Sequence, residues 1–251
     1  MDLTLNQANS YPISIPLYIQ IAEGLIAQIA SGELTPQDRL PSERELSEEL
    51  GVTRMTLRRA LGVLESQGLI IRVHGVGTYI AEPKIERQME KVFRFSNKMQ
   101  ERGFNPGAKI ISIEHIVADR ALSMKLALLD SSAVFSILRL RSINKEPVML
   151  ESYAIPEERF PGLDRYDLEG RSIYEVMEIE YNVSILRARQ SFEPVIATTF
   201  EAELLNIPVG DALMLEKRLS YDEDNIPIEY GVDRYRGDRF RFVTEAEPLD
   251  L

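Results

Sequence analysis

Two short helical patterns separated by Gly51-Val52, within residues 40–61 (LPSERELSEELGVTRMTLRRAL), constrain the fold of this chain more than any other feature. Ser42, followed three residues later by Glu45, has the capping-box spacing that predicts the start of the first helix. Thr53 is a suitable N-cap for the second helix. The apolar stripe of that second helix comprises Leu57, Leu61 and Leu64. The segment therefore predicts two helices joined by a tight turn.

The sequence on either side of these two helices adds an earlier helix and a hairpin. An apolar period of four residues after Pro16 predicts an amphipathic helix that ends near Gly32. The residues of this period are Leu17, Ile21, Leu25 and Ile29. Residues 69–73 and 78–80 are strand-like and flank a short glycine-containing turn. The order helix, helix, tight turn, helix, hairpin predicts a winged helix-turn-helix domain over residues 12–81.

Positive charge in this domain is concentrated at one place, although the chain is acidic. The formal net charge is -11, and residues 12–81 hold six arginines against eight acidic residues. Four of the six arginines lie between residues 44 and 59. The first turn of such a third helix enters the major groove of DNA, where arginine can bond guanine O6 and N7. We therefore expect a DNA reader. A merely solvated helix face is the alternative, and the agreement of caps, turn and hairpin disfavours it.

Composition excludes several other classes of protein. With 44% hydrophobic and 27% charged residues, the chain is typical of soluble globular proteins. It contains no cysteine and two histidines, His74 and His115, so neither a thiolate site nor a histidine-rich zinc site is expected. We expect no cofactor and no metal. The N-terminus lacks the pattern of a signal peptide and no apolar run is long enough to span a bilayer, so we expect a cytoplasmic protein without membrane contact.

A second domain follows a charged segment. Residues 82–91, EPKIERQMEK, hold six charges and a proline, and we expect a linker and hinge there. Residues 92–245 alternate strand-like runs with short helical patterns. Capping-box spacings at Ser172 with Glu175 and at Thr198 with Glu201 predict helix starts. The pattern predicts an α+β domain built on an antiparallel sheet.

Two arginines indicate a candidate anion site in this domain. Arg139 and Arg141 alternate within FSILRLRSI, so both project from the same face of one strand. Glu151 on the next strand lies opposite Arg139 if the connecting loop has three residues, and on the other face if it has two. Ser172 and Tyr174 stand at a helix start, where oriented N–H groups favour a phosphate or carboxylate. An internal Arg–Glu network without a ligand is the alternative.

The N-terminal stretch resembles the GntR family of bacterial transcription regulators. The resemblance lies in LPSERELSEELGVTRMTLRRAL, the helix end ESQGLI and the wing HGVGTYI. Met55 stands where relatives often have a small or hydroxyl residue, and Val76 where they often have Lys or Arg. The resemblance implies contacts with double-stranded operator DNA from Arg44, Thr53, Arg54, Thr56, Arg58, His74 and Gly75.

The remainder resembles the effector-binding domain of the HutC subfamily, a chorismate-lyase-like fold called the UTRA domain. The stretches that carry this resemblance include LRLRSINKEPVMLESYAIP, RSIYEVM and IPIEYGVDRYRGDRFRF. It implies a regulator, most often a repressor, that responds to a small anionic effector such as a phosphosugar or a small carboxylate. We expect a homodimer, because one winged helix buries too little interface for site-specific affinity and two symmetric copies match a palindrome. The implied effector contacts are Phe95, Ser96, Arg139, Arg141, Glu151, Ser172, Tyr174, Arg189, Glu229 and Tyr235. The fold resemblance also admits a rival, an enzyme of the chorismate-lyase type acting on a small carboxylate. The sequence offers no evident acid–base pair for it.

Overall fold

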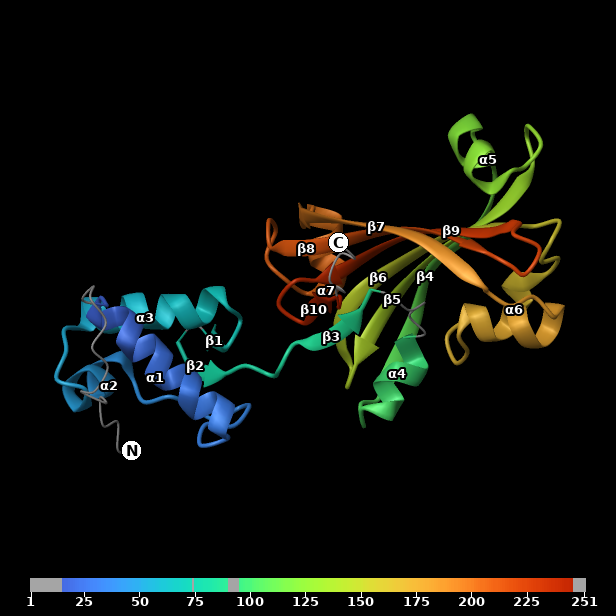
Figure 1. Ribbon diagram of the computed structural model, residues 1–251. Helices are drawn as coiled ribbons and strands as arrows, with labels where there is room; N and C mark the ends of the chain where they lie inside the picture. Colours follow the sequence, from blue (N-terminus) through green and yellow to red (C-terminus); the bar gives the residue numbers. More distant parts are fainter. Residues whose placement is uncertain (1–14, 74, 90–94, 246–251) are drawn as a thin grey trace, which may run out of the picture. The chain divides into compact units, whose positions relative to one another are not determined.

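The computed structural model describes residues 15–73, 75–89 and 95–245 (Figure 1). The chain divides between Lys84 and Ile85 into two compact units, each with its own hydrophobic clusters. Both predicted kinds of domain are therefore present. Within the described ranges, no helix is long and apolar enough to cross a membrane.

The first unit has the predicted order of elements. Its elements are α1 (Leu17–Ser31), α2 (Glu43–Glu49), α3 (Arg54–Ser66), β1 (Ile70–Val73) and β2 (Gly77–Ile80). The Ser42–Glu45 capping box is confirmed, because each residue's side chain accepts a hydrogen bond from the other's backbone N–H. Gly32 ends α1 in the left-handed conformation that glycine favours, with φ of 79°.

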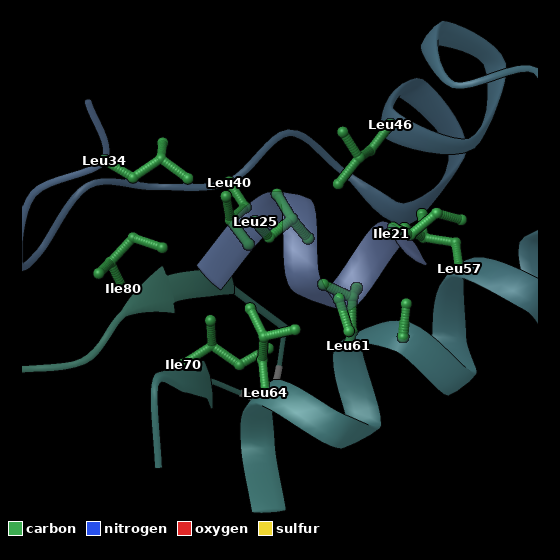
Figure 2. Close-up of a cluster of buried hydrophobic side chains, with 12 residues drawn as sticks. Ile21, Leu25, Leu34, Leu40, Leu46, Leu57, Leu61, Leu64, Ile70 and Ile80 are labelled. Carbon is green, nitrogen blue, oxygen red and sulfur yellow. The ribbon is translucent and has the colours of Figure 1, made fainter. Parts of the chain in front are cut away.

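Leucine and isoleucine side chains from every element of this unit form one core. Figure 2 shows Leu25 of α1, Leu61 and Leu64 of α3, and Ile70 and Ile80 of the hairpin converging on a common centre. All of these side chains are at most 2% exposed. Burial of this apolar surface fixes α3 against α1 and leaves the opposite face of α3 to solvent.

The β1–β2 hairpin is held to the loop before α2 by Arg39. The Arg39 guanidinium donates from Nη2 to the backbone oxygen of Val76 at 2.7 Å, and Arg39 also forms an isolated bridge with Tyr79. The wing therefore has a fixed position relative to the three helices of its own unit.

The second unit is an antiparallel six-stranded sheet in the order β4-β5-β6-β9-β8-β7, as the α+β prediction requires. Its strands are β4 (Pro106–Val117), β5 (Ala133–Ile143), β6 (Glu146–Pro156), β7 (Arg187–Ile196), β8 (Ala212–Tyr221) and β9 (Pro227–Arg236). Its helices are α4 (Phe95–Glu101), α5 (Arg120–Leu126), η1 (Leu163–Arg165), α6 (Ile173–Tyr181) and α7 (Thr199–Leu205).

Different helices cover the two faces of this sheet. On the face that carries Arg139, Tyr174 of α6 packs against Tyr153 of β6, and Phe95 of α4 lies under the Arg141 guanidinium. On the opposite face, α7 packs on β6 and α5 on β9. The predicted Thr198–Glu201 capping box starts α7 as expected.

A β-bulge decides how β5 faces β6. The turn between them has two residues, Asn144 and Lys145, both with positive φ, as a tight hairpin turn requires. The register shifts by one between Arg141 and Ser142, which makes Val148 an extra residue on β6. Glu151 consequently lies opposite Arg139. The sequence left two pairings open, and the one observed is the pairing that it linked to a three-residue loop, although the turn has two residues and the bulge supplies the difference.

Part of the segment expected to be a linker is a strand. Residues Ile85–Gln88 form β3, which pairs in parallel with β10 (Phe240–Val243). Ile85 and Arg87 are buried while Glu86 and Gln88 are exposed, so the alternation of a half-buried strand overrides the charge-rich composition. The expected linker over 82–91 is therefore wrong for these four residues, and Glu90 and Lys91 lie outside the described residues.

The core of the first unit gives a direct test of this packing. We expect Leu57→Ala to lower the free energy of unfolding of this unit by about 2–5 kcal/mol, because Leu57 is completely buried. Met55→Ala on the same helix is the control, since Met55 is 61% exposed, and it should change stability by about 0.5 kcal/mol or less. Urea titration of the full chain, followed by hydrogen exchange in peptides from residues 15–73, measures both. Equal effects would contradict the assigned core face.

Candidate DNA-reading face and buried charged network

The first turn of α3 is built by two threonines. Thr53 is the N-cap, and its hydroxyl accepts a hydrogen bond from the backbone N–H of Thr56 at 3.2 Å. The two hydroxyl oxygens also lie 2.9 Å apart, so they bond to each other. This local network presents the helix start, with its positive dipole end, on the exposed side of the unit.

Arg44, Arg54 and Arg58 project from α2 and α3 as exposed side chains. Arg44 lies 3.9 Å from Glu48 one helical turn later, a contact between two exposed groups that contributes little. In the wing, Gly75 is exposed and has a φ of 73°, a conformation that suits glycine. His74 lies outside the described residues.

Glu43 is a residue of this face that the sequence analysis did not identify. Its carboxylate accepts from Nε and Nη2 of Arg58 at 3.2 and 2.8 Å, both at Oε2, and from Nη1 of Arg72 at 3.2 Å. The hydrogen bond with Arg58 lowers the pKa of Glu43, which keeps it ionised. One carboxylate therefore links α2, α3 and β1. No spacing rule could have found this, because Glu43 and Arg58 lie on different helices.

The second candidate site lies on the α6 side of the sheet. All three guanidinium nitrogens of Arg139 there donate hydrogen bonds to other groups of the protein. Its Nε and Nη2 donate to Glu151 Oε2 at 3.1 and 2.8 Å, and its Nη1 donates to the backbone oxygen of Leu168 at 2.7 Å. The Arg139 side chain is 1% exposed. An Arg–Glu network of the kind that the sequence left as the alternative to an anion site is present, and Arg139 is one of its members.

Arg141, by comparison, has a hydrogen-bond donor that no described residue accepts from. Its Nη2 donates to the Ser96 hydroxyl at 2.7 Å, its Nη1 approaches Glu151 at 3.4 Å, and its guanidinium carbon lies 4.4 Å from the centre of the Phe95 ring. Its Nε is buried without a hydrogen-bond partner among the described residues. Burial lowers the pKa of Arg141, in part against the attraction of Glu151. The structure thus brings together Phe95, Ser96, Arg141 and Glu151.

A second cluster on the same face surrounds Glu229. Its Oε1 accepts from the Tyr174 hydroxyl at 3.0 Å, from Ser220 at 2.6 Å and from Arg218 Nε at 2.8 Å. Its Oε2, like Nη2 of Arg218, is buried without a partner in the described part of the chain. Both atoms face Gly231, because a Cβ at that glycine would come within 3.0 Å of Glu229 Oε2 and 2.4 Å of Arg218 Nη2. An unpaired acceptor and an unpaired donor therefore lie side by side.

The sequence analysis missed Arg218 and Asp233, which join this cluster. Arg218 Nη1 donates to Asp233 Oδ2 at 2.7 Å. Burial, with Glu216 and Glu151 nearby, raises the pKa of Asp233 to about 7, although Arg218 opposes the rise. A signal was present in the sequence, because Glu216 and Arg218 are two residues apart on β8 and Glu229 and Asp233 four apart on β9, so each pair lies on one face of its strand.

Three expected effector residues lie apart from these clusters or differ in detail. The Tyr235 hydroxyl donates to Glu216 at 2.8 Å within an aromatic group that includes Phe240. Arg189 is exposed on the edge strand β7. Ser172 is the N-cap of α6, but the expected capping box is wrong: its side chain makes no cap hydrogen bond in the described structure, and Arg171 Nε donates to Glu175 at 3.2 Å instead.

Comparisons with known proteins agree on both units. The model of bacterial regulatory proteins of the gntR family matches residues 17–80, and the UTRA domain model matches residues 101–241. The chain is 39% identical to the HTH-type transcriptional repressor NagR of Bacillus subtilis, over 94% of this chain and 96% of that protein. It is 31% identical to the Mannosyl-D-glycerate transport/metabolism system repressor MngR of Escherichia coli, over 92% of this chain and 96% of that protein. Among solved structures it is similar to PhnF from Mycobacterium smegmatis, with a TM-score of 0.66 and 27% identity over 90% of this chain and 99% of that one.

The raised pKa of Asp233 makes the stability of the second unit depend on pH. The folded protein retains a proton on Asp233 at pH values where the unfolded chain, with an ordinary value near 3.8, has lost it. The contribution of this group is therefore full below about pH 4 and is lost as the pH rises to about 7. We expect Asp233→Asn to flatten the fall in unfolding free energy over this range, as measured by urea titration at a series of pH values. Asp224→Asn, at an exposed turn residue, is the control, and an unchanged slope for Asp233→Asn would refute the assignment.

Proposed function

The chain belongs to the GntR family of bacterial regulatory proteins and carries a UTRA domain, and from this premise we propose that it is a repressor whose affinity for operator DNA changes when a small anion binds the second unit. Its family consists of DNA-binding transcription regulators, so the rival interpretation as a chorismate-lyase-type enzyme is wrong. Because a transcription regulator needs access to the chromosome, we propose the cytoplasm as its location.

DNA recognition is assigned to the exposed start of α3 and its neighbours. Arg54 and Arg58 are the base readers in this proposal, since both are exposed on the face of α3 that the core leaves free. Thr53, Thr56 and Arg44 contact phosphate oxygens, which suit hydroxyl groups, free N–H groups and a mobile guanidinium. The wing residues His74 and Gly75 approach the minor groove.

The active form is proposed to be a homodimer. One winged helix-turn-helix contacts a short half-site, and two copies related by a twofold axis match a palindromic operator and multiply the affinity. The second unit, with its larger sheet, is the part of the chain to which we assign dimerisation.

The effector site is proposed on the α6 side of the sheet, and the observation that carries it is the set of buried polar atoms without partners. In the described structure, Arg141 Nε and Arg218 Nη2 are unused donors and Glu229 Oε2 is an unused acceptor. Such atoms cost free energy unless a bound group satisfies them. A small anion that also carries hydroxyl groups does so, with the charge at Arg141 and Ser96 and a hydroxyl at Glu229.

The chemistry of this site fits phosphosugars and small carboxylates as classes. The name of the Escherichia coli relative refers to a mannosyl-D-glycerate system, a compound that joins a sugar to a carboxylate, and this supports the same class for the present chain. Phe95, Ser172, Tyr174, Arg189 and Tyr235 remain proposed effector contacts. Arg139 and Glu151 act in this proposal by fixing Arg141.

The effector changes DNA affinity only if it binds more tightly to one arrangement of the dimer than to another. We propose that the effector favours an arrangement in which the two DNA-reading units no longer match the half-site spacing. Because Ile85–Gln88 belongs to the second unit, the hinge is assigned to residues 82–84. A coupling of about 1–3 kcal/mol corresponds to a change in operator affinity of roughly 5- to 150-fold.

Two arginine variants separate base reading from phosphate contact. We expect Arg58→Ala to weaken binding to a selected operator by about tenfold or more, while binding to scrambled DNA changes far less. Arg44→Ala should weaken both kinds of DNA alike and make the salt dependence shallower. Fluorescence anisotropy titrations at several salt concentrations measure both effects. If Arg58→Ala leaves the preference for the operator intact, the assignment of Arg58 as a base reader fails.

The effector site is tested by changing Arg141 alone. Lysine retains the charge but lacks the Nε donor, so Arg141→Lys should weaken binding of a phosphosugar or small carboxylate by about tenfold or more. Isothermal titration calorimetry against a panel of both compound classes provides the measurement. Arg120→Lys, at an exposed position on α5, is the matched control. Equal affinities for the Arg141 variant and the unaltered protein would locate the anion site elsewhere.

A further inference from the structure

The acidic residue in the middle of the DNA-reading face requires an explanation. Glu43 is the first residue of α2, its side chain is 21% exposed, and it accepts hydrogen bonds from Arg58 of α3 and Arg72 of β1. DNA carries one negative charge per phosphate, so a carboxylate on this face repels the backbone. An isolated ion pair between exposed groups contributes little to stability. Its position therefore points to a role in recognition.

We infer that Glu43 is a positioning residue for DNA recognition, which orients Arg58 toward a base and restrains Arg58 and Arg72 from binding phosphate without regard to sequence. This inference rests on the proposed role of Arg58 as a base reader. Glu43 itself contacts no base in this arrangement and acts through the two arginines.

Among the described residues, the hydrogen bonds of Arg58 leave free the donors that base reading requires. A guanidinium has five N–H donors, and Glu43 Oε2 occupies those on the Nε–Nη2 edge, at 3.2 and 2.8 Å. The outer N–H of Nη2 and both donors of Nη1 point away from this edge. Nη1 and Nη2 are the pair of nitrogens that can bond guanine O6 and N7 in bidentate fashion. The Glu43 carboxylate thus fixes the plane of the Arg58 guanidinium without using the outward-pointing donors of Nη1 and Nη2 that would bond to a base.

Arg72 extends the same restraint to the wing. Its Nη1 donates to Glu43 at 3.2 Å, and its Nε lies 3.1 Å from Glu65 of α3. The strand β1 is therefore tied to α2 and α3 by two carboxylates. Arg72 is about one-third exposed, so neutralising Glu43 gives phosphate a further cation to attract.

This arrangement predicts that Glu43 lowers affinity for DNA in general and raises the preference for the operator. The measurement uses the full-length protein and two DNA duplexes. One is a duplex that the protein selects from a random-sequence pool, and the other is a scrambled version of it. Dissociation constants are determined for both at several salt concentrations. The variants are Glu43→Gln, which removes the charge, and Glu43→Asp, which keeps the charge but shortens the side chain. Glu49→Gln, at an exposed position of the same helix, is the control for loss of one negative charge.

For Glu43→Gln we expect tighter binding to scrambled DNA, a salt slope steeper by about one unit, and a preference for the selected duplex reduced by about tenfold. Glu43→Asp should reduce the preference while leaving the salt slope unchanged, because only the orientation of Arg58 is altered. Equal effects of Glu43→Gln and Glu49→Gln would overturn the inference, since charge alone would then explain them. A parallel loss of affinity for both duplexes, with a lower melting temperature, would also overturn it by showing a structural role only.

Arg58→Ala distinguishes failure of this inference from failure of the proposed function. If Arg58→Ala abolishes the preference and both Glu43 variants leave it intact, Arg58 reads a base without help from Glu43. If Arg58→Ala has no effect on preference, the assignment of the base reader itself is wrong, and the inference falls with it.

Discussion

The ion pair between Arg139 and Glu151 is the contact on which the candidate effector site depends. Both side chains are almost completely buried, and a buried charge is tolerated only when it is paired and its remaining hydrogen-bonding groups are satisfied. Arg139 meets this condition within the protein, through Glu151 and two backbone oxygens. Arg139 donates two hydrogen bonds to Glu151 Oε2, whereas Arg141 approaches the same oxygen only at 3.4 Å. The unequal sharing of one carboxylate leaves Arg141 as the guanidinium with spare capacity.

An arginine–glutamate pair behaves differently at the candidate DNA-reading face, where Glu43 and Arg58 are in contact with water. High dielectric screening makes such a pair contribute little to stability, so the role that we infer for it is to orient Arg58 and not to stabilise the fold. In the interior, the Arg139–Glu151 pair is expensive to break, because removing one partner would leave a buried charge unpaired. Two arginine–glutamate contacts in one chain therefore have opposite consequences, and solvent exposure is the variable that separates them.

In the function that we propose, this distribution of charge gives specificity. With a net charge of -11, most of the surface repels DNA, and attraction is confined to the few exposed arginines of α2 and α3. The candidate effector site also gathers a few arginines in one place, in this case in the interior. There the guanidinium groups of Arg139, Arg141 and Arg218 are paired with Glu151, Glu229 and Asp233, and burial raises the pKa of Asp233 to about 7.

The sequence by itself determined the elements whose stabilising contacts are local. Helix starts at Ser42, Thr53 and Thr198 were predicted because the capping groups lie within three residues of each other. The same spacing failed at Ser172, where the preceding Arg171 takes the Glu175 carboxylate. Periodicity also placed Arg139 and Arg141 on one face of a strand. That much follows from the geometry of a single element.

Only the tertiary structure decided the contacts made between elements. The strand β3 was missed because Ile85 pairs with Phe240, and no local pattern records a partner so distant in sequence. The bulge at Val148 set the register that a two-residue turn alone would have placed on the wrong face. Glu43 joined Arg58, and Arg218 joined Glu229, only once separate helices and strands had packed. A charge pattern specifies which side chains can pair, but packing of the core determines which of them come within hydrogen-bonding distance.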